Sequence, residues 1–236
     1  MEKTPKLYLF PVPLSDVGPE QVLPGSNLQL LLGIRYFVVE NLRSARRFLK
    51  ACHKSIIIDD LEFTELSEHT PPGEVDAMLA PMAHGHSIGV ISEAGCPAVA
   101  DPGADLVAAA QRRGYEVVPL VGPSSILMSL MGSGFNGQRF TFNGYLPIDA
   151  RARAGKLKDM QQAIRRDHCT QIFIETPYRN NKLIEELCRV LPADMLLCVA
   201  SDITGPRQRI NTRRIDQWRR IKPDYDKIPA IFLLNS

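Results

Sequence analysis

The sequence lacks the short motifs that mark the commonest nucleotide-binding and hydrolytic enzymes. It has no G-x-G-x-x-G in its first strand–helix turn and no G-x-x-x-x-G-K-[ST]. The sequence therefore lacks the motifs that identify dinucleotide-binding and P-loop folds. H-E-x-x-H and G-x-S-x-G are absent too, which removes the usual zinc-protease and α/β-hydrolase signatures. His84 and His86 have no acidic or cysteine neighbour at ligand spacing, so no metal site is predicted.

The sequence also has few cysteines and no long apolar run. The cysteine number is odd and no two have C-x-x-C spacing, so neither a disulfide framework nor a zinc site is expected. Reduced thiols in a cytoplasmic protein fit this usage best. No apolar run approaches 18 residues, so no membrane span is expected, and Leu7–Phe10 is too short for a signal peptide. The cysteines are Cys52, Cys96, Cys169, Cys188 and Cys198.

Charge is unevenly distributed along the 236 residues, although the formal net charge is only +2. Residues 1–119 hold 10 Lys/Arg and 15 Asp/Glu, a balance of −5. Residues 120–236 hold 18 Lys/Arg and 11 Asp/Glu, a balance of +7. Such a difference in charge between the two halves suggests two domains and a polyanionic partner for the second.

Short apolar runs alternate with helical patterns along the whole chain, which favours an α/β fold. We expect two α/β domains, residues 1–120 with a parallel sheet and residues 121–236 with a mixed sheet. The expected strands are Lys6–Val12, Tyr36–Val39, Ser55–Ile58, Ser87–Ser92, Glu116–Leu120, Arg139–Tyr145, Gln171–Glu175, Met195–Ala200 and Pro229–Leu234. The expected helices are Leu28–Gly33, Arg43–His53, Gly73–His84, Asp101–Arg113, Gly122–Met131, Ala150–Arg166, Asn180–Leu191 and Arg213–Arg220.

Two segments run from the end of an expected strand to the start of a helix. Ligands of open parallel sheets bind outside the carboxyl ends of the strands, so Ile91–Gly103 and Pro119–Ile126 are candidate ligand loops. Gly95 would allow a ligand to approach the backbone. Equally, the first segment fits a tight connection that needs Gly and Pro for geometry alone, and Ser124 and Ser125 fit helix capping.

The motifs in these segments resemble those of a known family. Ser92–Gly103, read as SEAGCPAVADPG, is similar to the S-D-A-G-T-P-x-x-x-D-P-G signature of the tetrapyrrole methylase superfamily. Val118–Ser125 resembles V-P-L-P-G-P-S-A, and Arg139–Pro147 resembles R-F-x-F-x-G-F-L-P. Phe173–Arg179 resembles F-Y-E-S-P-H-R, and Glu40–Leu49 resembles E-D-T-R-x-x-R-x-L-L. Within the superfamily the pattern is closest to the small-subunit ribosomal RNA ribose 2′-O-methyltransferases.

The resemblance implies a homodimer and S-adenosylmethionine bound in a cleft between the two α/β domains. By matching motif, three segments would form the cofactor pocket. They are Ser92, Glu93, Ala94, Gly95, Cys96 and Pro97 in the first, Gly122, Pro123, Ser124 and Ser125 in the second, and Pro229, Ala230 and Ile231 in the third.

The sequence departs from the family pattern in its first loop. The family's T-P-I-G-N-L corresponds to Val12–Val17, where Ser15 replaces the glycine. Asn41 and Leu42 replace Asp and Thr, Glu93 replaces Asp, and Ser201–Gly205 matches the family's R-E-L-T-K only loosely.

A ribose hydroxyl has a high pKa, so a general base would assist methyl transfer to it. The acids considered are Asp16, Glu40, Glu93, Asp101 and Glu175. Asp101 fits a helix cap and Glu40 fits an ion pair with Arg43. No base is assigned, and Glu93 and Glu175 remain as candidates that would line the cleft.

The basic second half predicts an RNA surface, because phosphate contacts give affinity without reading sequence. A second basic group lies in Arg151–Arg166, and Trp218 and Tyr225 are candidate stacking partners. A solvated helix face explains such charge runs equally well. The candidate RNA-binding residues are Arg207, Arg209, Arg213, Arg214, Arg219 and Arg220.

Three hypotheses follow. The first is an S-adenosylmethionine-dependent methyltransferase that acts on a ribose of small-subunit ribosomal RNA. The second keeps the methyl donor but takes a corrin-type tetrapyrrole as acceptor. The third is a non-catalytic RNA-binding descendant of the same fold, which Ser15 in the altered first loop motivates.

Overall fold

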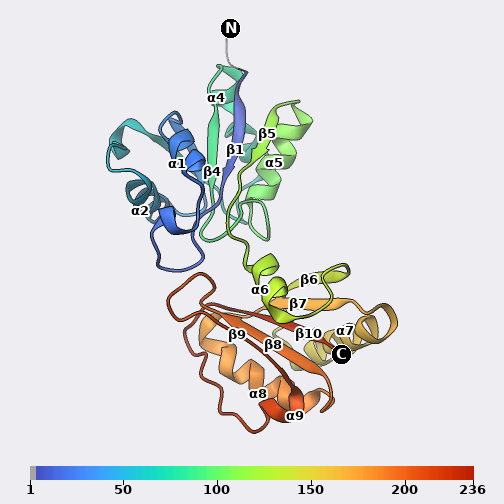
Figure 1. The fold of residues 1–236 in the computed structure, drawn as a ribbon. Helices are drawn as coiled ribbons and strands as arrows, with labels where there is room; N and C mark the ends of the chain where they lie inside the picture. The colour runs from blue at the N-terminus through green and yellow to red at the C-terminus, as the bar shows by residue number, and fades with distance from the viewer. Residues whose placement is uncertain (1–3) are drawn as a thin grey trace. The chain divides into compact units, whose positions relative to one another are not determined.

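The computed structural model describes residues 4–236, and the chain divides into two compact units. The first unit is Met1–Ser124 and the second is Ser125–Ser236 (Figure 1). Each contains one five-stranded sheet with helices packed on it. The α/β class, with a parallel sheet in the first half and a mixed sheet in the second, is confirmed.

The sheet of the first unit is parallel throughout, in the order β3-β2-β4-β1-β5. Its strands are β1 Lys6–Phe10, β2 Tyr36–Val39, β3 Glu62–Glu65, β4 Ile88–Ile91 and β5 Glu116–Pro119. All four residues of the central strand β4 are buried. Successive side chains point to opposite faces, so Leu7 and Leu9 join one core cluster and Phe10 joins the other.

Helices cover both faces of this sheet, as expected of a parallel sheet. Leu106 of one helix packs in the cluster with Leu7, and Leu49 of another packs in the cluster with Phe10. The helices are α1 Gly25–Leu31, α2 Leu42–Cys52, α3 Pro72–Ala77, α4 Ala80–Ala83 and α5 Gly103–Arg112, with 3-10 turns η1 Pro19–Gln21 and η2 Ile58–Asp60.

Two expectations about the first unit are wrong. The strand expected at Ser55–Ile58 is a turn region, and the edge strand is instead the polar β3, which pairs with β2 alone. The single helix expected at Gly73–His84 is broken into α3 and α4. Pro81 explains the break, because its ring removes a backbone donor and clashes with the preceding turn.

The sheet of the second unit is mixed, in the order β6-β7-β10-β8-β9. β6 and β7 are parallel, and the other neighbouring pairs are antiparallel. The strands are β6 Phe140–Tyr145, β7 Thr170–Ile174, β8 Leu196–Ser201, β9 Arg209–Arg214 and β10 Ala230–Asn235. The edge strand β9 was not expected, because its sequence RINTRR reads as a charge run.

Helices also cover both faces of the second sheet (Figure 1). Helix α6 packs on β8, β9 and β10, whereas α7 and α8 join the core cluster on the other face. The helices are α6 Ser125–Ser133, α7 Ala150–Asp167, α8 Asn180–Val190 and α9 Ile215–Trp218, with the 3-10 turn η3 Pro177–Arg179.

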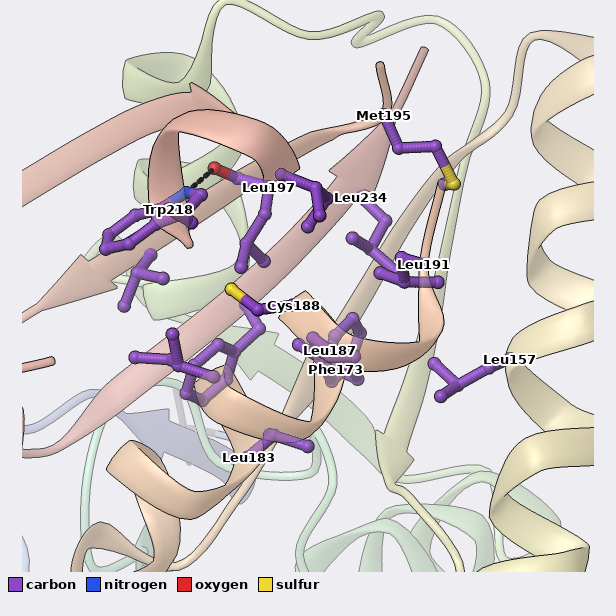
Figure 2. Packing of buried hydrophobic residues seen from close by; sticks show 14 of the residues in the cluster. Leu157, Phe173, Leu183, Leu187, Cys188, Leu191, Met195, Leu197, Trp218 and Leu234 are labelled. Atoms are coloured by element: carbon purple, nitrogen blue, oxygen red, sulfur yellow. Dashed lines mark hydrogen bonds between the residues drawn. The ribbon is translucent and has the colours of Figure 1, made fainter. Parts of the chain in front are cut away.

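Aromatic rings form the centre of the second unit's core. Phe173 stacks on Phe232 with 5.7 Å between ring centroids. The Trp218 side chain is 2% exposed, and its indole N–H donates to the Leu197 carbonyl at 2.9 Å (Figure 2). Tyr225 is 4% exposed. The expectation that Trp218 and Tyr225 stack on RNA is therefore wrong, because their rings are used inside the core.

Among residues 4–236, no helix combines the length and the apolar character needed to cross a membrane.

Candidate functional site

The order of strands in the first unit creates a switch point between β1 and β4. The chain leaves β1 towards β2 on one side and leaves β4 towards β5 on the other. Loops diverge there, and ligands of open parallel sheets bind at such a point. The two loops pair with each other: Val12 N–H donates to the Gly95 carbonyl at 2.9 Å, and Gly95 N–H donates to the Val12 carbonyl at 3.1 Å.

A cavity of about 410 Å³ opens beside these paired loops. Its volume is in the range of small-molecule sites. Three segments line it: the loop after β1, the loop after β4, and one face of α2. The lining includes Val12, Leu14, Ser15, Asp16, Ser44, Arg47, Phe48, Ser92, Glu93 and Ala94.

Glycines allow the close packing of the predicted ligand loops. Gly95 has φ +74°, and a Cβ there would lie 3.1 Å from Leu14 Cδ2 and 3.5 Å from the Pro123 carbonyl oxygen. A Cβ on Gly122 would lie 2.2 Å from Pro11 Cβ. Cys96 Sγ donates to the Pro123 carbonyl at 3.4 Å. The structure thus brings the loops of Ser92–Pro97 and Gly122–Ser124 together.

Acidic side chains hold the loop that follows β4. The Glu93 backbone N–H donates to Glu40 Oε2 at 3.0 Å, and the Ser44 hydroxyl donates to Glu93 Oε1. Asn41 caps α2, accepting from the N–H groups of Arg43 and Ser44 at 2.9 and 3.1 Å. Glu40 therefore positions Glu93, and its expected ion pair with Arg43 is not formed.

Asp101 supports the same loop from its other end. Its carboxylate accepts from the Gly103 N–H at 2.7 Å and from the Ala98 N–H at 2.9 Å. Burial raises the pKa of Asp101. The N-cap of α5 is Pro102 rather than Asp101, so Asp101 acts one residue earlier than a standard cap.

Ser92 carries an unpaired polar atom beside the cavity. Its hydroxyl oxygen is buried and has no hydrogen-bond partner among residues 4–236. A buried hydroxyl without a partner is costly, so Ser92 is a polar group available to a ligand or an ordered water.

Comparisons with known proteins find relatives named as ribosomal RNA methyltransferases. No family model matches the chain. It is 29% identical over 200 residues to "Ribosomal RNA small subunit methyltransferase I" of Vibrio cholerae, covering 85% of this chain and 65% of that protein. The protein of the same name from Pseudomonas aeruginosa is 36% identical over 199 residues, covering 84% of this chain and 65% of that protein. The chain thus spans slightly less than two thirds of these relatives.

Solved structures share the fold over almost the entire chain. The methyltransferase CobJ superposes with a TM-score of 0.64 at 18% identity, covering 98% of this chain and 93% of that one. Uroporphyrin-III C-methyltransferase from Thermus thermophilus, complexed with S-adenosyl homocysteine, superposes with a TM-score of 0.59 at 18% identity, covering 98% and 97%.

These comparisons support the resemblance to the tetrapyrrole methylase superfamily that the sequence motifs carry. The chain departs from that family's pattern at the candidate site: Ser15, which replaces the first-loop glycine, lines the cavity together with Asp16. The altered loop is therefore part of the candidate site.

The other predicted site residues lie in the second unit, as follows. Ser125 begins α6. Pro229 precedes β10, in which Ala230 pairs with Ser201 and Ile231 with Ala200. Their contribution to a shared cofactor pocket stays a prediction.

Glu175 is held by its own loop. Its Oε1 accepts from the Thr176 N–H at 2.7 Å, and its Oε2 accepts from Arg179 at 2.7 Å. The Glu175 side chain is 7% exposed. Both carboxylate oxygens are thus engaged in bracing η3, and a role as base stays a prediction.

The six candidate RNA-binding arginines differ in their surroundings. Arg219 donates to the Cys188 and Leu191 carbonyls at 2.8 and 3.1 Å and so caps the end of α8. Arg209 lies 4.5 Å from the centroid of the Tyr225 ring, and Arg213 lies 6.0 Å from that of Trp218. The Arg214 side chain pairs with Asp216 at 3.3 Å. Arg207 and Arg220 are exposed.

The part of the chain from residue 4 onward holds no group of three His, Cys, Asp or Glu side chains that would bind a metal ion.

Two buried cysteines are held in the thiol form. Burial raises the pKa of Cys52 to about 12 and that of Cys198 to about 11, so both stay protonated at neutral pH.

Glu40→Gln is expected to stabilise the protein at neutral pH. Burial raises the pKa of Glu40, the hydrogen bond from Glu93 N–H opposes this, and the charges of Asp101 and Glu93 add to it. The folded state therefore binds the Glu40 proton more tightly than the unfolded state, and stability falls as pH rises from 4.5 through the folded pKa. A glutamine removes that penalty and still accepts the hydrogen bond.

The measurement is the melting temperature, Tm, between roughly pH 4 and pH 8. The advantage of the variant should be largest at the upper end and vanish at the lower end. Glu185→Gln on the exposed surface of α8 serves as control and should change Tm little at any pH. A lower Tm for Glu40→Gln at neutral pH would show that the charged hydrogen bond outweighs the cost of burial.

Proposed function

We propose that this chain transfers the methyl group of S-adenosylmethionine to a ribose 2′-hydroxyl of small-subunit ribosomal RNA. The observation that carries the proposal is the position of the superfamily signature: Ser92, Glu93 and Ala94 form a wall of the cavity at the switch point. The curated relatives named as ribosomal RNA methyltransferases support the acceptor. The solved relative complexed with S-adenosyl homocysteine supports the donor.

The residues around the cavity suit a sulfonium donor. The carboxylates of Glu93 and Asp16 line the cavity and would attract the positively charged sulfonium group of the donor. The Arg47 guanidinium lines it too and would pair with the carboxylate of the donor. The buried Ser92 hydroxyl is free to donate or accept there. Gly95, which follows this wall, has no side chain and so allows the loop to pair closely with Val12. These groups bind and orient the donor, which supplies an electrophilic methyl group when bound.

Positioning accounts for much of the expected catalysis. Methyl transfer breaks the C–S bond, forms a C–O bond in line with it, and releases the hydroxyl proton, so orientation of the reacting atoms dominates the rate. Of the two acids that line the cavity, Asp16 and Glu93, we take Glu93 as the group that receives the proton, because Glu40 holds its backbone N–H and Ser44 holds its carboxylate. Glu93→Gln should lower kcat more than it weakens donor binding.

A tetrapyrrole acceptor has weaker support. The tetrapyrrole methyltransferases among the solved structures are 18% identical and share the fold. The curated relatives, at up to 36% identity among those compared, carry ribosomal RNA names. The basic second half also favours RNA.

The proposal includes a homodimer in the cytoplasm. Large apolar side chains exposed on the second unit support a protein partner: Met131 is 82%, Tyr145 62% and Ile148 80% exposed. Light scattering on the purified chain should give a mass close to twice 26.3 kDa. A monomer at micromolar concentration would contradict the dimer.

Transfer of labelled methyl from S-adenosylmethionine to small ribosomal subunits tests the proposal. The subunits come from cells that lack this gene, and donor binding is measured on the same preparation. Label in RNA ribose supports the proposal. Donor binding without label would move the acceptor to a tetrapyrrole or another molecule, and neither label nor donor binding would favour a non-catalytic protein.

A further inference from the structure

Helix α7 presents a row of free cations on the side away from the core. Leu157, Met160 and Ile164 are its buried residues, and Leu157 points from α7 into the core cluster (Figure 2). With 3.6 residues per turn, positions spaced by four and three residues form one stripe on the side away from these core residues. All residues of that stripe are exposed: Arg151, Gly155, Lys158, Gln162 and Arg165.

The three cations of this row have no partner within the chain. Across residues 4–236, Arg151, Lys158 and Arg165 make no ion pair and no side-chain hydrogen bond. The other arginines of α7 differ, because Arg153 pairs with Glu186 at 2.8 Å and Arg166 with Asp167 at 2.7 Å. The free cations stand seven residues apart, or about 10 Å along the axis. Each can therefore contact a different phosphate.

Two positions in the row weaken the helix and need an explanation. Arg151 is in the first turn, where the helix dipole disfavours a cation. Gly155 is mid-helix, where glycine is less favourable than alanine. A Cβ on Gly155 would meet nothing within 4 Å, so no steric contact within the chain requires glycine. A ligand that approaches the backbone closely between Arg151 and Lys158 would explain both.

We propose that the α7 row (Arg151, Gly155, Lys158, Gln162 and Arg165) binds the phosphate backbone of the RNA substrate. The inference rests on the proposed function, since it names the surface that holds the proposed acceptor. In the β9 region Arg209, Arg214 and Arg219 are engaged with groups of the chain, and of the other candidates there Arg207 and Arg220 are exposed. The row is favoured because, within the part of the chain that the structure describes, all three of its cations are free and lie on one helix. Such backbone contacts supply affinity and salt dependence rather than sequence recognition.

The test is the affinity of the full chain for unmodified small-subunit ribosomal RNA made by transcription, measured by filter binding across a series of salt concentrations. In the variant Arg151→Ala/Lys158→Ala/Arg165→Ala, Kd should rise at least about tenfold near 0.1 M salt. The log–log salt slope should become smaller by about 2 to 3. Binding of S-adenosylmethionine should not change.

Matched variants separate this surface from general charge effects. Lys182→Ala/Arg189→Ala removes two exposed cations of the neighbouring helix α8 instead and should change Kd less than about twofold. Arg213→Ala/Arg214→Ala tests β9 in the same way. Gly155→Ala should raise Tm or leave it unchanged while weakening RNA binding, a combination that a purely structural role would not produce.

The outcomes separate the surface from the activity. Unchanged RNA binding by the triple variant, an equal loss in the control pair, or no RNA binding by the natural chain would overturn the inference. If the triple variant misfolds, Gly155→Ala decides. If row variants lose RNA binding but the natural chain transfers no methyl group, the surface stands and the proposed activity fails.

Discussion

Gly95→Arg is expected to abolish S-adenosylmethionine binding, with Kd raised by at least about 100-fold. Gly95 has φ +74°, a conformation that an arginine adopts only with strain. Its Cβ would lie 3.1 Å from Leu14 Cδ2, and the backbone of Gly95 is paired with Val12. The long side chain would have to enter the cavity or separate the two loops, and either change removes the proposed donor site.

Isothermal titration of S-adenosylmethionine into the purified variant measures this effect. Gly114→Arg is the matched control, because Gly114 has φ +72° at the end of α5 but nothing within 4 Å of its Cβ position. The control carries the same backbone strain and should bind the donor normally. Donor binding by a folded Gly95→Arg protein would place the donor elsewhere and remove the main support for the proposed site.

Trp218→Ala is expected to destabilise the second unit by about 3–5 kcal/mol. The side chain is 2% exposed, and truncation would leave a cavity beside Leu197 and Tyr225. It would also leave the Leu197 carbonyl without the indole donor at 2.9 Å. Urea unfolding followed by circular dichroism measures the loss. Trp218→Phe keeps most of the ring and should cost considerably less.

The same residue separates a core role from RNA stacking. Trp218 is the single tryptophan of the chain, so the fluorescence of the natural protein reports on it alone. We expect blue-shifted emission that added RNA does not quench, because the ring is buried. Strong quenching by RNA would restore Trp218 as a stacking partner and contradict the buried position.

The fold was predictable where hydrophobic pattern and tertiary role agree. Strand β2 has the predicted bounds Tyr36–Val39, and β4 and β10 agree within a residue or two. These strands are buried, so their apolar runs appear directly in the sequence. Two edge strands, β5 and β6, were predicted from their apolar residues, whereas the edge strands β3 and β9 were missed because they read EFTE and RINTRR. An edge strand is paired on one side only, and a polar one is held by backbone pairing, which leaves no hydrophobic pattern in the sequence.

The candidate site was predictable only in part. The glycine and proline residues of Ser92–Pro97 mark a loop at the end of a strand, and the structure has that loop there. The cavity lining from α2, including Ser44 and Arg47, was not predicted. It depends on the strand order around the switch point, which brings Ser44 and Glu93, 49 residues apart, to one edge of the sheet and has no local signature.

By itself, the sequence determined the α/β class, the resemblance to a known superfamily and the loops that follow the buried strands. Local propensity, burial pattern and glycine positions carry that information along the chain. Only the tertiary structure decided which charged and aromatic groups are available. Trp218 and Arg219 look like surface groups in the sequence, yet one fills the core and the other caps α8, while Arg151, Lys158 and Arg165 stay free. Availability depends on which partners a fold brings within hydrogen-bonding distance, and those partners lie far away in the sequence.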